Sequence, residues 1–76
     1  MSSFPILIKF KSGKTVTLEV ESDTTIAVLK EKLQDKEGIP CSLQTFYACG
    51  HILEDHQTLE ELHIHKEAVI HFIDSP

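Results

Sequence analysis

Apolar residues alternate with polar ones in two neighbouring stretches near the start of the chain. The alternating apolar residues are Phe4, Ile6, Ile8 and Phe10 in the first stretch, and Val16, Leu18 and Val20 in the second. Successive side chains of a strand point to opposite faces, so each stretch predicts a strand with one buried face. Between them, Lys11-Ser12-Gly13-Lys14 predicts a hairpin turn, because Gly13 can adopt a positive φ.

A helical pattern follows the second stretch. Ile26, Leu29 and Leu33 recur at spacings that place them on one side of a helix. Thr25 can cap the start of this helix, and Gly38 can end it at the left-handed position that follows the last turn. The pattern therefore predicts one helix over residues 26–37.

The remaining part of the chain predicts shorter elements. They are a strand over 44–48, a tight turn at 49–50, a shorter strand over 51–54, a helical turn over 58–62 capped by Thr58, and a last strand over 68–73. In the last strand Ile70 and Phe72 face one way, whereas Val69, His71 and Ile73 face the other. This order fits a mixed sheet wrapped on one helix, although the pattern leaves the strand order open.

Composition narrows the class of protein. The chain has 76 residues and a net charge of −5, which argues against nucleic acid as a partner because phosphate binding needs a basic face. No apolar run approaches the ~20 residues of a membrane span, and the first residues do not resemble a secretory signal. The two cysteines, Cys41 and Cys49, make no disulfide framework and indicate free thiols in the cytoplasm and/or nucleus.

Two runs of sequence carry a resemblance to a known family. Residues 13–21 read Gly-Lys-Thr-Val-Thr-Leu-Glu-Val-Glu, and residues 34–40 read Gln-Asp-Lys-Glu-Gly-Ile-Pro. Both resemble ubiquitin, and the similarity continues along nearly the whole chain. Residues 21–26 are in addition similar to parkin-type ubiquitin-like domains. The resemblance implies an α+β protein with the β-grasp fold: a mixed five-stranded sheet wrapped on one main helix, plus a short helical turn.

The end of the chain departs from the resemblance. Ubiquitin closes in an exposed Gly-Gly, whereas this chain closes in Asp74-Ser75-Pro76, and Pro76 has a fixed φ and no N–H. We therefore expect residues 1–76 to be a single, non-conjugated ubiquitin-like domain, the N-terminal domain of a longer protein. The alternative is a conjugable modifier whose precursor extends beyond Pro76 to a Gly-Gly terminus.

The resemblance also implies an interaction surface. At the positions of ubiquitin's apolar patch and its rim, this chain has Lys11, Tyr47, His51, Ile52, His71 and Ile73. An aromatic residue with a cationic rim is typical of interfaces, although scattered surface apolar residues are also normal. We expect a monomer that docks its host onto ubiquitin receptors or the proteasome through the sheet face around Tyr47, or that binds other domains of its host.

Residues with metal-binding or catalytic chemistry form no recognised motif. His63-Ile64-His65 and the pair Cys49 and His51 lack the spacing of dedicated metal sites. Cys49 beside His51 also lacks an evident third group that would orient a catalytic base. The sequence thus predicts a binding module without enzymatic activity, metal or cofactor.

Overall fold

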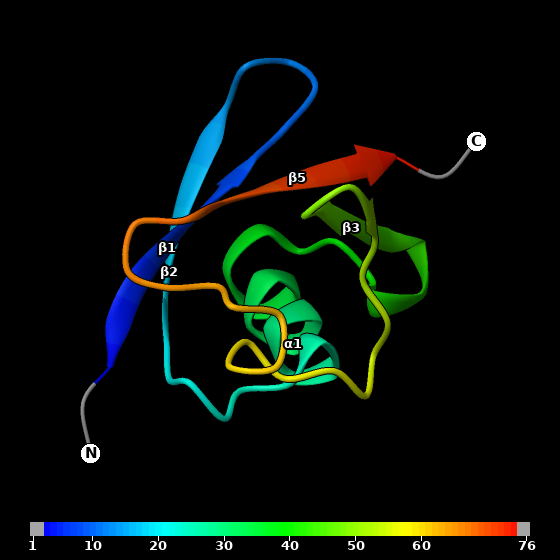
Figure 1. Cartoon of the computed structure of the whole chain (residues 1–76). Helices are drawn as coiled ribbons and strands as arrows, with labels where there is room; N and C mark the ends of the chain where they lie inside the picture. Colours follow the sequence, from blue (N-terminus) through cyan, green and yellow to red (C-terminus); the bar gives the residue numbers. More distant parts are fainter. Residues whose placement is uncertain (1–2, 75–76) are drawn as a thin grey trace.

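A mixed five-stranded sheet curves around one helix, in the strand order β2-β1-β5-β3-β4 (Figure 1). The computed structural model describes residues 3–74. Its elements are β1 Phe4–Lys9, β2 Thr15–Val20, α1 Ile26–Glu37, the 3₁₀ turn η1 Cys41–Leu43, β3 Gln44–Ala48, β4 His51–Ile52 and β5 Val69–Asp74. The predicted β-grasp fold is confirmed. Ser75 and Pro76, on which the expectation about the tail rests, lie outside the described residues.

The first and last strands are neighbours at the centre of the sheet. β1 pairs antiparallel with β2, from Phe4 opposite Val20 to Lys9 opposite Thr15. On its other side β1 pairs parallel with β5, with Leu7 opposite Val69. The β1–β2 turn extends away from α1 (Figure 1), and Gly13 in this turn has a φ of 97°. The predicted hairpin is therefore confirmed, and β5 joins it to the β3–β4 pair.

Both predicted ends of α1 are confirmed. The Thr25 hydroxyl accepts a hydrogen bond from the Val28 N–H at 3.3 Å, and the Gly38 N–H donates to the Gln34 carbonyl at 2.8 Å. Gly38 has a φ of 75°, a conformation that glycine adopts without the clash of a Cβ. In the described part of the chain, no helix is long and apolar enough to span a membrane.

Two predicted strands differ in extent, and one element was not predicted. β4 ends at Ile52 rather than residue 54, because the chain turns toward α1, where the Asp55 carbonyl accepts the Ala27 N–H at 3.0 Å. β5 covers Val69–Asp74 rather than residues 68–73. The predicted helical turn over 58–62 and its cap are confirmed, because the Leu62 N–H donates to the Thr58 carbonyl and the Glu61 N–H to the Thr58 hydroxyl, both at 3.1 Å. The 3₁₀ turn η1 is only three residues long and has no side-chain cap that its sequence could have signalled.

The core lies between the inner face of the sheet and α1. Its fully buried side chains include Ile6, Ile8, Phe46 and Ile70 from the strands and Ile26, Leu29 and Leu33 from the helix. Phe4 and Phe10, which were expected to face inward, are half-buried and pack against this cluster. Phe10 also stacks on Phe72 with ring centroids 4.8 Å apart. The alternation in the sequence therefore identifies the inner face of the sheet correctly.

Gln44 is the one buried polar side chain among the described residues, with 3% of its surface exposed. Its amide nitrogen donates to the carbonyls of Lys30 in α1 and Ile39 after the helix, at 2.8 and 2.9 Å. These two carbonyls orient the amide, because only its NH₂ group can donate to them. Gln44 thus connects the start of β3 to α1 and to the segment that follows the helix.

We expect Gln44→Met to lower the free energy of unfolding by about 1–3 kcal/mol, because both side-chain hydrogen bonds are lost and the carbonyls of Lys30 and Ile39 each lose a partner. Urea unfolding followed by circular dichroism measures this change. The control Lys32→Met alters an exposed lysine of α1 and should cost under about 0.5 kcal/mol. Equal stabilities of the two variants would contradict the role assigned to Gln44.

Candidate functional site

The strand pairing assembles one row of side chains across the outer face of the sheet. Lys9 of β1 lies opposite His71 of β5. His71 lies opposite Tyr47 of β3, which in turn lies opposite Ile52 of β4. Paired residues of neighbouring strands point to the same face. The row therefore brings together residues that are up to 62 positions apart in the chain (71 − 9 = 62).

Apolar side chains are exposed in and beside this row. The exposed fractions are 38% for Tyr47, 48% for Ile52, 44% for Val69 and 39% for Ile73. The residues between them along the strands, such as Phe46 and Phe72, are buried on the inner face. The predicted parity of β3 and β5 is thus confirmed. We call the group Lys9, Tyr47, Ile52, Val69, His71 and Ile73 the outer-face patch.

Two of the predicted site residues do not belong to the outer-face patch. Lys11 is exposed and lies in the β1–β2 turn, beyond the end of β1. His51 lies opposite Ala48, which is buried, so the register gives His51 the parity of the inner face. His51 is exposed because β4 is the edge strand of the sheet. It therefore borders the outer-face patch at Ile52 instead of forming part of the row with Tyr47.

One neighbour of the patch was not among the predicted site residues. Thr45 lies opposite Ile73 and is two residues from Tyr47 along β3, so it shares the outer face. It is only half-buried. The alternation of residues 44–48 carries the signal that could have identified it, since Thr45 and Tyr47 have the same parity. Thr45 places a hydroxyl at the margin of an otherwise apolar and cationic surface.

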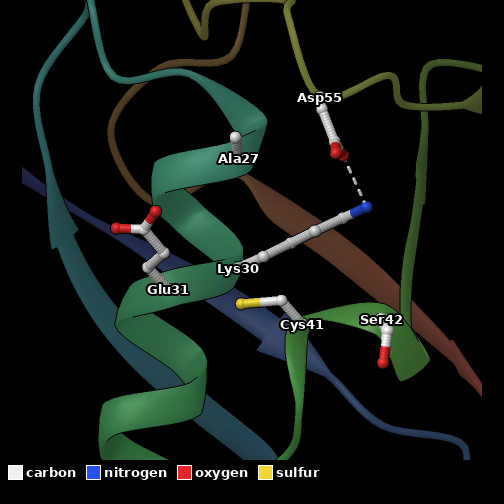
Figure 2. A pocket seen from close by; sticks show the side chains of 6 residues that line it. All are labelled: Ala27, Lys30, Glu31, Cys41, Ser42 and Asp55. Carbon is white, nitrogen blue, oxygen red and sulfur yellow. Dashed lines mark hydrogen bonds and ion pairs between the residues drawn. The ribbon is translucent and has the colours of Figure 1, made fainter.

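A separate hollow of about 340 Å³ lies beside α1 and is lined by Ala27, Lys30, Glu31, Cys41, Ser42 and Asp55. Figure 2 shows the Lys30 side chain reaching across it to Asp55, with 2.6 Å between ammonium and carboxylate. The Cys41 thiol donates to the Gln34 side-chain oxygen at 2.9 Å. The Lys30 ammonium is thus already paired with Asp55, and the Cys41 thiol is already hydrogen-bonded to Gln34. These two contacts connect α1 to the segment around Asp55 and to η1.

Cys49 and the histidines do not assemble a catalytic or metal centre among the described residues. The Cys49 thiol points to the Leu62 carbonyl, with 3.6 Å between sulfur and oxygen. Its backbone is left-handed, with a φ of 56°, which is uncommon for a residue other than glycine. Within residues 3–74 no three side chains of His, Cys, Asp or Glu gather as a metal ion would require. The outer-face patch therefore remains the strongest candidate site.

Comparison with known proteins gives relatives over nearly the whole chain. Ubiquitin domain-containing protein 1 of Rattus norvegicus is 36% identical over 70 residues, which are 92% of this chain and 31% of that protein. The E3 ubiquitin-protein ligase parkin of Rattus norvegicus is 27% identical over 71 residues, 93% of this chain and 15% of parkin. Ubiquitin-like protein 1 of Schizosaccharomyces pombe is 29% identical over 68 residues, 90% of this chain and 87% of that protein.

These coverages show how the chain relates in size to its relatives. It spans 31% of ubiquitin domain-containing protein 1 and a smaller part of parkin, so those proteins contain much besides the shared region. The family model described as the ubiquitin family matches residues 6–75. That match includes the central strands, α1 and the outer-face patch, and it agrees with the β-grasp arrangement of the sheet. The chain belongs to the ubiquitin family.

Proposed function

We propose that this ubiquitin-like domain is a non-conjugated protein-interaction module that docks its host onto ubiquitin receptors or the proteasome, in the cytoplasm or nucleus. The observation that carries the proposal is the exposure of Tyr47, Ile52 and Ile73 on one face. Exposed apolar groups gathered around an aromatic residue are typical of binding surfaces. In the E3 ubiquitin-protein ligase parkin, the matching region is a small part of the whole protein, which supports a role for this chain as one module of a larger protein.

Chemical-shift mapping by NMR tests this proposal. Titration with a synthetic ubiquitin-interacting helix should shift the amide signals of Tyr47, Ile52, His71 and Ile73 together, because these residues share the outer face. Signals of α1, which lies behind the sheet, should move little and serve as the internal control. Shifts confined to α1, or no shifts with either ubiquitin-receptor helices or proteasomal receptors, would contradict docking through this face.

A conjugable modifier is the second candidate. It is favoured by the match to ubiquitin-like protein 1, because the aligned region makes up 87% of that protein and shows that a family member can consist of little else. Incubation of the natural, full-length protein with ubiquitin-activating enzyme and ATP separates the two candidates. A thioester adduct through the C-terminus would support the modifier and contradict the docking module.

A further inference from the structure

β2 is an edge strand of the sheet, and part of its backbone faces away from β1. The Leu7 N–H donates to the Ala68 carbonyl at 2.9 Å, so the backbone of Leu7 bonds toward β5 instead of β2. In an antiparallel pair, both residues at such a position turn their N–H and C=O groups away from each other. Thr17, which lies opposite Leu7, therefore directs both groups to the free edge of β2.

The same alternation applies two residues to either side of Thr17. The carbonyl of Pro5, which lies opposite Glu19, accepts the Glu67 N–H at 2.8 Å, so Pro5 also bonds away from β2. Thr15 has the same parity as Thr17 and Glu19. The backbone groups of these three β2 residues thus form a free edge, which we call the β2 edge. It is separate from the outer-face patch, none of whose residues lies in β2.

Lys36 of α1 covers the middle of the β2 edge. Its ammonium donates to the Thr17 carbonyl at 2.7 Å, and within residues 3–74 it is the one side chain that hydrogen-bonds to this edge. The next residue, Glu37, pairs with Lys14 just before β2, so the last turn of α1 lies beside the strand. At its other end the edge is open, because a hollow of about 420 Å³ adjoins Glu19. A lysine at a sheet edge discourages pairing with another strand.

We propose that the β2 edge pairs with the β2 edge of a second copy of the chain, and that Lys36 holds this pairing surface closed. Antiparallel pairing centred on Thr17 places the Thr17 residues of both copies opposite each other, and Thr15 of each copy opposite Glu19 of the other. At each of these positions the two residues exchange both of their hydrogen bonds. Every outward N–H and C=O group of the two edges then has a partner.

Charge and turn geometry select this register. Centring on Glu19 would place two glutamates directly opposite each other, which disfavours pairing. Centring on Thr15 would bring Gly13 opposite Thr17, although Gly13 lies in the β1–β2 turn with a φ of 97°, outside the extended range. The register centred on Thr17 places only Thr15 opposite Glu19. The edge is thus complementary to itself, which favours a second copy as its occupant.

The charge of Lys36 opposes this pairing. The two-fold axis of the pair passes beside Thr17, so the Lys36 ammoniums of both copies meet there, each on a carbonyl that the other copy requires. Like charges that face each other disfavour association. Without them the two sheets join into one, and both outer-face patches lie on the same side because the axis is perpendicular to the sheet. If the proposed docking function holds, such a pair binds a partner with two sites more tightly.

Removal of the Lys36 charge tests the proposal. Sedimentation equilibrium of Lys36→Met should show a dimer, with a dissociation constant at least about tenfold below the value or lower limit of the unchanged chain. Lys36→Arg keeps a cationic donor and should remain as monomeric as the unchanged chain. Lys66→Met removes the charge of an exposed lysine outside the β2 edge and should change the constant less than about twofold. A monomeric Lys36→Met variant, or equal dimerisation of the three variants, would overturn the proposal.

Two further measurements locate the contact at β2. In a mixture of isotope-labelled and unlabelled Lys36→Met chains, the α protons of Val16 and Leu18 from different copies should show a nuclear Overhauser effect, because they form the closely spaced pair next to the axis. Adding Thr17→Pro removes the central N–H and should restore the monomer, while circular dichroism stays that of a folded chain because edge strands tolerate proline. If Thr17→Pro unfolded the chain, the Val16–Leu18 contact alone would decide.

A folded dimer that survives Thr17→Pro, or one that lacks the Val16–Leu18 contact, would contradict pairing through the β2 edge. Neither result bears on the docking function, which titration of the outer-face patch tests in the monomeric, unchanged chain.

Discussion

Replacement of Phe46 by alanine is expected to lower the free energy of unfolding by about 3–5 kcal/mol. Phe46 is fully buried in β3, and its ring meets that of Phe72 edge to face, with centroids 6.0 Å apart. Removing the ring leaves a cavity between sheet and helix that the surrounding side chains fill only in part. Because small domains are stable by only about 5–15 kcal/mol, this loss should bring the variant close to unfolding. Thermal and urea unfolding followed by circular dichroism measure the change.

The next residue along β3 provides the matched control. Tyr47 is an aromatic residue of similar size in the same strand, but it faces outward and is 38% exposed. Tyr47→Ala should therefore cost under about 1 kcal/mol of folding stability, since its ring leaves no internal cavity. Equal losses for the two variants would mean that β3 does not have the inner and outer faces described above.

The same Tyr47→Ala change is expected to have a large effect on binding. An aromatic residue near the centre of an interface often contributes about 2 kcal/mol or more, so the dissociation constant for a ubiquitin-interacting helix should rise roughly 30-fold. Tyr47 lies between His71 and Ile52 in the row, so its ring occupies the middle of the surface that the proposed partner would cover. Isothermal titration calorimetry of the folded variant gives this ratio.

An exposed apolar residue outside the patch provides a control. It tests whether the partner recognises the outer-face patch or any exposed apolar side chain. Leu43 in η1 is 53% exposed, more than Tyr47, and it belongs to none of the five strands. Leu43→Ala should leave the dissociation constant unchanged within about a factor of two. If Leu43→Ala weakened binding as much as Tyr47→Ala, the partner would be recognising scattered apolar residues instead of the outer-face patch.

The faces of the strands could be predicted from the sequence because alternation is a local property. In β5 the buried Ile70 and Phe72 alternate with the exposed Val69, His71 and Ile73, as their order in the chain predicts. The ends of α1 were equally predictable, because Thr25 and Gly38 act through hydrogen bonds to residues close to them in the chain. Local chemistry therefore accounts for most of the elements.

The composition of the outer-face row depends on long-range register, which local patterns do not contain. Lys9, His71 and Tyr47 become neighbours only because β5 lies between β1 and β3, and the pattern left that order open.

The position of His51 is a different case. A two-residue turn pairs the residues on either side of it, so Cys49-Gly50 already implied that Ala48 lies opposite His51. That pairing gives His51 the parity of buried Ala48 instead of exposed Tyr47.

The parallel pairing of β1 with β5 has a consequence for folding during synthesis on the ribosome. β1 and β5, in which Leu7 lies opposite Val69, can pair only after both strands have been synthesised. Until β5 leaves the exit tunnel, the β1–β2 hairpin and the β3–β4 pair share no strand contact, since β5 is the strand that lies between them. Contacts so distant in the chain are slow to form because a long loop must close first. The five-stranded sheet of the nascent domain therefore cannot be completed until β5 has emerged.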